Sequence, residues 1–255
     1  MRRRRVDALA EQQHPQSRSF EQVAELYERA RPSYPEEAVD WLVEELHLGG
    51  DSIVLDLGAG TGKLTRRFVA RVGRVVAVEP GPEMLAQLRR AVPEAEPLLG
   101  AAESIPLGDQ SVDAVACGQS FHWFRREEAV HEIRRVLRPG GGLGLIWNAR
   151  DQKDPLQAEV TKLLEPLVPP GRDSLRVAAT RFVAEVFGNL RTAEFPFEQE
   201  LDAEGLVERV SSISFVAAAP EAAREELQRR LRALVADRGE SLRFRYRTEA
   251  YVSRA

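Results

Sequence analysis

Apolar and polar residues follow two patterns along this chain, one typical of buried strands and one typical of helices. Short apolar runs without polar interruption, such as Ile53-Val54-Leu55, indicate strands covered on both faces, whereas apolar residues three or four positions apart indicate amphipathic helices. We expect strands at 53–57, 74–79, 96–99, 111–117 and 142–148, with helices at 62–72, 82–91 and 126–137. This alternation predicts a parallel sheet with right-handed crossovers.

The flanking segments predict further helices and two long strands. Residues 1–18 are polar and lack periodicity, which predicts a flexible tail, and Ser19-Phe20-Glu21-Gln22 is typical of a capping box that opens a helix through Ala30. A second helix is expected from Pro35 to Gly49. After residue 148 we expect helices at 153–168, 178–187, 203–213 and 221–237, and strands at 190–201 and 242–252.

Three glycines at alternate positions, Gly58, Gly60 and Gly62, follow the first buried strand. Glycine adopts backbone torsion angles that other residues avoid, so this spacing predicts a tight loop lying close to a ligand. Glu79 ends the next strand about 20 residues later, where a carboxylate can accept hydrogen bonds from ribose hydroxyls. Together the loop and the acidic residue predict a nucleotide-like cofactor.

The positions of the glycines separate classes of cofactor. A dinucleotide-binding loop has the pattern G-x-G-x-x-G, but Lys63 occupies the third glycine position here and Asp56 would repel a pyrophosphate. A P-loop would need glycine at Leu57 and a hydroxyl at Leu64. The carboxylate of Asp56 tolerates a cationic ligand instead. An NAD-dependent oxidoreductase is therefore disfavoured but stays an alternative.

The segment Val54-Leu55-Asp56-Leu57-Gly58-Ala59-Gly60-Thr61-Gly62 resembles the first motif of the class I S-adenosylmethionine (SAM)-dependent methyltransferases. SAM carries a ribose diol, a positive sulfonium, and a methionine end with an ammonium and a carboxylate. The resemblance implies an α/β fold: a Rossmann-like three-layer sandwich with a seven-stranded, mostly parallel sheet, an antiparallel last strand and a helical insert before the sixth strand. It also implies that SAM contacts Asp56, Gly58, Gly60, Thr61, Gly62, Glu79, Pro80 and Met84.

A second loop resembles the part of this family that cradles adenine. Gly100-Ala101-Ala102-Glu103 follows the third strand and is similar to the family's G-D-A-E-x-L-P loop. Ala101 stands where the family has aspartate, which removes that side chain's hydrogen bond to the adenine amino group, whereas the backbone of Ala102 can still recognise a ring nitrogen. We expect Ala101, Ala102 and Glu103 to contact the cofactor, with an ordinary strand-to-turn connection as the alternative.

A polar and then aromatic segment, Gln119-Ser120-Phe121-His122-Trp123, follows the fourth predicted strand beside the glycine loop. Gln119 and Ser120 are expected to line the cofactor pocket, and Trp123 is expected to pack on the sulfonium or close the acceptor pocket. Because an imidazole titrates near neutral pH, His122 is the candidate base for an acceptor hydroxyl. Core packing of these rings is the alternative.

The stretch from Tyr27 to Pro35 resembles the Y-x-x-x-R-P-x-Y-P segment of a type-11-like branch of this family, which also carries S-x-H-W after the fourth strand. Tyr27 and Arg31 share one helix face, and the resemblance implies that they cover the methionine end of SAM. An exposed cap packed by tyrosines is the alternative. The segments 138–141 and 147–151 match two further motifs of the branch, and Trp147 and Arg150 are expected to line the acceptor pocket.

Composition limits the number of domains and the classes of partner that the chain can have. The 255 residues, 43% of them hydrophobic, suffice for one domain over 19–255, with a helical cap at 19–49 and a substrate lid at 151–187. A net charge of -4 predicts no nucleic-acid partner, and no apolar run is long enough to cross a membrane. A single cysteine, Cys117, excludes an internal disulfide, predicts no cysteine-rich metal site and favours the cytoplasm.

These observations predict an enzyme that transfers the methyl group of SAM to a small-molecule acceptor by in-line displacement. Methylation of oxygen, nitrogen or a carboxyl group stays open, as does a monomer or a homodimer. The alternative that is not an enzyme is a regulatory module that binds SAM without catalysis. The 33 arginines, set against three lysines, are taken as a compositional bias rather than as a binding feature.

Overall fold

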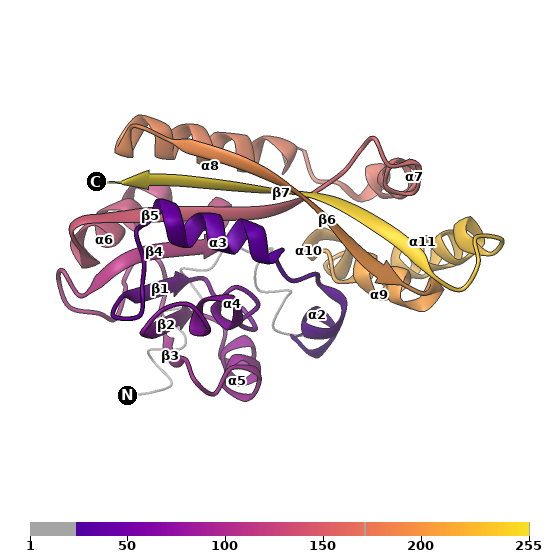
Figure 1. The fold of residues 1–255 in the computed structure, drawn as a ribbon. Coiled ribbons are helices and arrows are strands. Elements are labelled where there is room, and N and C mark those ends of the chain that lie inside the picture. The colour runs from indigo at the N-terminus through magenta and orange to yellow at the C-terminus, as the bar shows by residue number, and fades with distance from the viewer. Residues whose placement is uncertain (1–23, 171, 255) are drawn as a thin grey trace.

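A seven-stranded sheet with helices on both faces forms the centre of the computed structural model, which describes residues 24–170 and 172–254 (Figure 1). The strand order is β3-β2-β1-β4-β5-β7-β6, and β7 runs antiparallel to both of its neighbours. The strands are β1 (Ile53–Leu57), β2 (Arg74–Glu79), β3 (Glu96–Leu99), β4 (Val112–Gly118), β5 (Leu137–Arg150), β6 (Arg191–Leu201) and β7 (Leu242–Arg254). The mostly parallel sheet with an antiparallel last strand is confirmed.

The helices connect these strands in the order that the sequence predicts. Before β6 they are α2 (Ala24–Ala30), α3 (Glu36–Glu45), α4 (Thr65–Val69), α5 (Pro82–Ala91), α6 (Arg126–Val136), α7 (Pro155–Leu164) and α8 (Arg172–Phe187). Between β6 and β7 lie α9 (Ala203–Ser211), α10 (Ser214–Ala217) and α11 (Glu221–Val235). Two short 3-10 helices, η2 (Phe121–Trp123) and η3 (Glu165–Leu167), complete the set.

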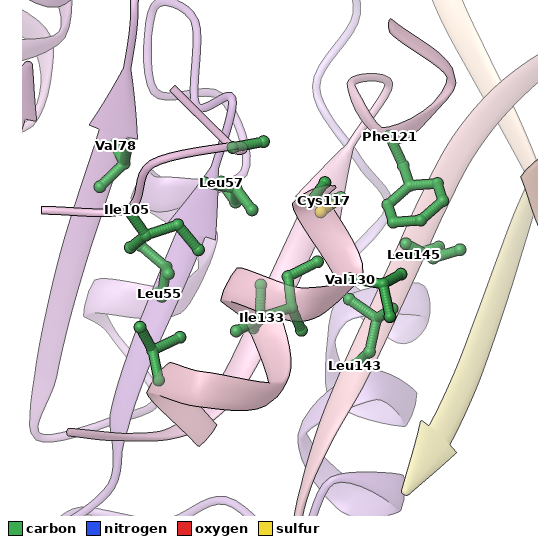
Figure 2. Close-up of a cluster of buried hydrophobic side chains, with 14 of the residues drawn as sticks. Leu55, Leu57, Val78, Ile105, Cys117, Phe121, Val130, Ile133, Leu143 and Leu145 are labelled. Atoms are coloured by element: carbon green, nitrogen blue, oxygen red, sulfur yellow. The ribbon is translucent and has the colours of Figure 1, made fainter. Parts of the chain in front are cut away.

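Separate apolar clusters attach helices to the two faces of the sheet. On one face Val130 and Ile133 of α6 lie near Leu143 and Leu145 of β5, as Figure 2 shows, and α8 joins the same cluster. On the other face α3 and α4 bury their apolar sides against β1, β4 and β5. Burial of the sheet on both faces explains why its central strands are continuous apolar runs.

A third apolar cluster lies beyond the main body of the sheet, where β6 and β7 extend toward α9 and α11 (Figure 1). It joins Leu206 of α9, Leu231 of α11 and Phe244 of β7 with the buried face of α7. We call α7, α9, α10 and α11 the outer lobe. This lobe is built by the chain that follows β5, so the glycine loop and the lobe come from distant parts of the sequence.

The glycine loop changes the expected start of the helix that follows it. The expected start at Gly62 is wrong, because the φ angle of this residue is 87° and lies outside the helical region. The helix begins at Thr65 and ends at Val69 rather than at Val72. The pairing of β4 with β5 shifts in register between Val112 and Ala114 of β4, so the motif at 138–141 forms an irregularity inside a longer strand, β5.

Other boundaries also differ from the expectation. The helix expected at 178–187 begins at Arg172, and the one at 153–168 ends at Leu164 and continues as η3. The helix expected at 203–213 ends at Ser211, and a further short helix, α10, follows it. These segments have charged or small residues at their ends, which weaken the helical periodicity of the apolar residues. The predicted tail at 1–18 and the capping box at 19–22 lie outside the described residues.

Two further findings concern the described residues as a whole. Every helix in the ranges 24–170 and 172–254 is too short or too polar to cross a membrane. Within the same ranges, no three His, Cys, Asp or Glu side chains gather as they would to bind a metal ion.

Replacing Leu145 by alanine tests the core of β5. The side chain is fully buried, so Leu145→Ala is expected to lower the free energy of unfolding by about 2 to 5 kcal/mol through lost burial and an unfilled cavity. Urea denaturation measures the change. Val177→Ala is the control, because Val177 is 50% exposed and its truncation should shift the free energy by less than about 0.5 kcal/mol. Equal effects of the two substitutions would contradict the assigned core.

Candidate functional site

The glycine loop is pressed against the residues that follow β4. A Cβ atom on Gly58 would lie 2.7 Å from the Cβ of Ser120, and the φ angle of Gly58 is 71°. The Ser120 hydroxyl donates a 2.7 Å hydrogen bond to the carbonyl of Leu57, directly before the loop. Glycine is therefore required at position 58 both by the backbone angle and by the space.

Glu79, at the carboxyl end of β2, shapes the same loop. One carboxylate oxygen accepts a 2.8 Å hydrogen bond from the backbone N–H of Gly60, and the other accepts one of 2.9 Å from Gly81. Each carboxylate oxygen has two lone pairs, so Glu79 can accept further donors. Pro80 follows it directly, and Met84 is buried in the first turn of α5.

Asp56 lies buried at the end of β1, below the loop. The Thr65 hydroxyl donates a 2.6 Å hydrogen bond to one of its oxygens, Oδ2. The other oxygen, Oδ1, has no hydrogen-bond partner among the described residues. Burial raises the pKa of this carboxyl to about 6, although the bond from Thr65 favours the charged form.

A small cavity of about 40 Å³, which we call the narrow cavity, opens beside Asp56. One water-sized group needs about 10 to 15 Å³, so this volume suits a few small polar groups rather than a whole nucleoside. Seven residues predicted from the sequence line it: Tyr27, Arg31, Asp56, Gly58, Gly60, Thr61 and Gln119. The sequence analysis missed seven others: Pro32, Tyr34, Ala59, Lys63, Leu64, Gly118 and Arg209.

The lysine that replaces a third glycine attaches α2 to the loop. Lys63 Nζ donates a 2.6 Å hydrogen bond to the carbonyl of Glu28 and lies 3.5 Å from its carboxylate. Arg66, one turn further on, pairs with the same carboxylate at 2.9 Å. Burial lowers the pKa of Lys63. The predicted cap helix is thus held over the glycine loop, which places Tyr27 and Arg31 at the narrow cavity.

A larger cavity of about 510 Å³, the wide cavity, lies on the other side of Gln119. Gln119 lines both cavities, and its φ angle of 60° turns the chain sharply after β4. Its backbone N–H donates to Ile146 at 2.9 Å, which fixes this turn against β5. The other lining residues are His122, Trp147, Asn148, Ala149, Arg150, Gln152, Thr161, Arg176 and Arg247.

The charge of the wide cavity is positive. Its described lining includes three arginines, Arg150, Arg176 and Arg247, and no acidic residue. Behind them the buried carboxylate of Glu249 pairs with Arg176, lies 3.2 Å from Arg247 and accepts a 2.8 Å hydrogen bond from the Tyr251 hydroxyl. The buried carboxylate of Glu249 therefore orients two guanidinium groups, and Arg247 also lies 3.4 Å from the carboxylate of Glu194, which is outside the cavity lining.

His122 and Trp147 form a pair at the edge of the wide cavity. The indole N–H of Trp147 donates to Nδ1 of His122 at 3.2 Å. Because an indole nitrogen can only donate, a neutral His122 carries its proton on Nε2. Trp123 packs on the His122 ring with centroids 4.4 Å apart and does not belong to the cavity lining, although it was predicted there.

The predicted adenine loop lies apart from both cavities. Ala101 and Ala102 are buried, and a carboxylate oxygen of Glu103 accepts a 2.7 Å hydrogen bond from the backbone of Arg125. Gly62 and Ser120 also lie outside the two linings; Ser120 supports the loop through Leu57. Contacts of these residues with a cofactor stay predictions.

The narrow cavity fits the amino acid end of SAM by its unpaired polar atoms. Among the residues that the structure describes, Asp56 Oδ1, Thr61 Oγ1 and Arg209 Nη1 are buried without hydrogen-bond partners, and all three residues line this cavity. Buried polar groups are normally paired, so such atoms indicate a ligand. An anionic acceptor, a hydroxyl and a cationic donor together complement an ammonium and a carboxylate.

Similarity to known proteins agrees with this arrangement. Residues 55–145 match the sequence profile of the family described as a methyltransferase domain. An uncharacterized methyltransferase of Mycobacterium tuberculosis is 43% identical over 220 residues, which span 86% of each chain. An uncharacterized methyltransferase-like protein of Schizosaccharomyces pombe is 44% identical over 215 residues, or 80% of this chain and 81% of that protein.

A solved structure extends the similarity to the fold. The candidate type II methyltransferase from Anaeromyxobacter dehalogenans superposes with a TM-score of 0.71 and 26% identity, covering 88% of this chain and 97% of that one.

The raised pKa of Asp56 predicts a pH-dependent affinity for S-adenosylhomocysteine, the demethylated form of SAM. A bound ammonium favours the ionised carboxylate, so the pKa of about 6 falls when the ligand binds. Below pH 6 binding must also ionise Asp56, and the association constant should fall by up to about tenfold per pH unit, while it stays flat above pH 7. Calorimetry between pH 5 and 8 measures this slope. Asp56→Asn should abolish it, and a flat profile in the unaltered protein would contradict the assignment.

Proposed function

This chain belongs to the class I SAM-dependent methyltransferases, and on that premise we propose that it methylates a carboxylate of a small acid held in the wide cavity. The observation that carries the proposal is that the narrow and wide cavities meet at Gln119, one fitted to an amino acid and the other lined by arginines. When bound, SAM supplies a methyl group on a sulfonium, which is already activated for displacement.

On the cofactor side, we assign the residues predicted from the sequence to the ribose, the methionine end and the adenine of SAM. Glu79 is positioned at the end of β2 to accept from the ribose hydroxyls, beside Pro80 and Met84. Asp56 faces the ammonium, with Tyr27 and Arg31 closing the same cavity from α2. Ala101, Ala102 and Glu103 follow β3, the next strand of the sheet, and are assigned to the adenine.

On the acceptor side, charge selects the substrate. The described lining of the wide cavity carries three guanidinium groups and no carboxylate, while Glu249 and Glu194 pair with Arg176 and Arg247 from outside the lining. A dicarboxylic acid suits this lining: arginines bind one carboxylate by charge-assisted hydrogen bonds while the other is presented to the methyl group. The cavity volume of about 510 Å³ suits a molecule of small size.

A carboxylate acceptor also agrees with the protonation of His122. The bond from Trp147 leaves the proton on Nε2, so a neutral His122 donates a hydrogen bond with that atom and does not remove a proton with it. A carboxylate oxygen is already deprotonated: its lone pair forms the O–C bond as the C–S bond breaks and its electrons go to sulfur. His122 thus orients the acceptor, and the protein contributes by alignment and by excluding water.

Residues of the predicted lid take part in the wide cavity. Thr161 of α7 and Arg176 of α8 line it, together with Gln152 between β5 and α7. The insert at 151–187 therefore contributes acceptor contacts rather than only covering the sheet. We assign substrate selection to this insert and to Arg247 of β7.

Substitution of Glu79 tests the cofactor side by calorimetry. Glu79→Ala removes a charged acceptor, and we expect the affinity for S-adenosylhomocysteine to fall at least about tenfold. Glu83→Ala is the matched control, because Glu83 lies four residues away on the exposed side of α5 and should change the affinity less than twofold. Undiminished affinity in Glu79→Ala would remove Glu79 from the site.

Substitution of Arg247 tests the acceptor side. With a panel of dicarboxylic acids, Arg247→Met is expected to raise the acceptor KM about 10- to 100-fold by removing a charge-assisted bond, with little change in the KM for SAM. Arg245→Met is the control on the same strand; Arg245 pairs with Glu198 and lies outside the cavity lining. Release of S-adenosylhomocysteine is the measured product. Turnover with neutral amines or phenols but not with acids would overturn the acceptor class.

The same assay separates the alternatives. A non-catalytic SAM-binding module would bind SAM and release no S-adenosylhomocysteine with any acceptor of the panel. An oxidoreductase would instead shift the fluorescence of NADH on binding. Either result, obtained with the unaltered protein, would overturn the proposed reaction.

A further inference from the structure

Arg209, on α9 of the outer lobe, is a buried cation without an acidic partner in the described part of the chain. Arg209 is only 5% exposed, and its Nη1 atom has no hydrogen-bond partner among the described residues. Nε donates a 2.7 Å hydrogen bond to the hydroxyl of Tyr246, a neutral group. A buried charge is unfavourable unless it is paired, so this guanidinium is suited to the anionic group of a ligand.

The narrow cavity is where that anion would lie. Arg209 lines it together with Asp56 and Thr61, each of which has a buried oxygen without a hydrogen-bond partner among the described residues. Asp56 is negative and Arg209 is positive, and both line this cavity. A zwitterion therefore fits in one orientation only, with its ammonium at Asp56 and its anionic group at Arg209.

We propose that Arg209 binds the α-carboxylate of the methionine end of SAM, so that the outer lobe completes the cofactor site. The inference rests on the proposed function for the identity of the cofactor. The carboxylate is the one anionic group of SAM; the sulfonium and ammonium are cationic, and the adenosine is neutral. Arg31 approaches the same cavity from α2, and its Nη2 donates a 2.8 Å hydrogen bond to the carbonyl of Ser212.

Contacts around Arg209 hold α9 and α2 together at this cavity. Arg29 of α2 pairs with Glu208 of α9 through two hydrogen bonds of 2.7 and 2.8 Å. The Tyr246 hydroxyl donates to Gln199 at 3.3 Å, and Gln199 donates in turn to the carbonyl of Ala30 at 3.1 Å. Arg209 is therefore positioned from two sides, by its helix and by Tyr246. This support fixes the guanidinium before the cofactor arrives, which lowers the entropy lost on binding.

The test compares SAM with decarboxylated SAM, which keeps the ammonium and the sulfonium and lacks the carboxylate. Calorimetry gives the ratio of the two affinities for each protein variant. The unaltered protein should prefer SAM at least about tenfold, because a charged hydrogen bond is lost with the carboxylate. In Arg209→Met the preference should fall to less than about threefold, while the affinity for decarboxylated SAM changes little.

Two control variants separate binding from a structural role. Arg232→Met removes an arginine of the same lobe that pairs with Glu204 at the surface, and it should keep the full preference for SAM. Arg209→Lys keeps the charge and should restore part of the preference lost in Arg209→Met. A merely structural role would weaken both ligands equally and leave their ratio unchanged.

The outcomes distinguish this inference from the proposed function. If Arg209→Met keeps the preference of the unaltered protein for SAM, the role of Arg209 is overturned while the methyltransferase assignment stands. If the unaltered protein binds neither SAM nor S-adenosylhomocysteine, both are overturned. A preference that disappears in Arg209→Met and persists in Arg232→Met supports the role assigned to Arg209.

Discussion

The close approach between Gly58 and Ser120 is the constraint on which the site depends. No side chain fits at position 58, and the chain after β4 can therefore lie directly against the loop after β1. This contact brings Gln119 between the two cavities, where it lines both. In a parallel sheet the neighbouring strands β1 and β4 end at the same edge, so one steric requirement places the cofactor loop and the acceptor wall side by side.

Incompletely balanced charges in the interior give the two cavities their different chemistry. Asp56 is buried with one unpaired oxygen, and Arg209 is buried without an acidic partner in the described chain. The lining of the wide cavity instead has three arginines, two of which pair with the carboxylate of Glu249. Each arrangement lowers the stability of the free protein. The lost free energy is regained when a ligand of the complementary charge binds. The narrow cavity is thus suited to a zwitterion and the wide cavity to an anion.

Four elements were predictable from the sequence because their signals are local. β1, β2, α5 and β3 begin and end as expected, since apolar runs and breakers delimit them within a few residues. The start of α4 was not predictable from periodicity, because the positive φ angle of Gly62 interrupts a continuous helical pattern. Arg209 gave no signal either: it is one of 33 arginines, and it reaches the glycine loop through a fold that the local sequence does not reveal. The arginines of the wide cavity likewise come from β5, α8 and β7.

A crystal structure of the protein with S-adenosylhomocysteine tests the central claim most directly, namely that the narrow cavity holds the amino acid end of the cofactor and the wide cavity the acceptor. The account predicts that the ligand's carboxylate lies within hydrogen-bond distance of Arg209, its ribose at Glu79 and its sulfur beside Gln119, facing the wide cavity. An amino acid end bound instead among Arg150, Arg176 and Arg247 would contradict it.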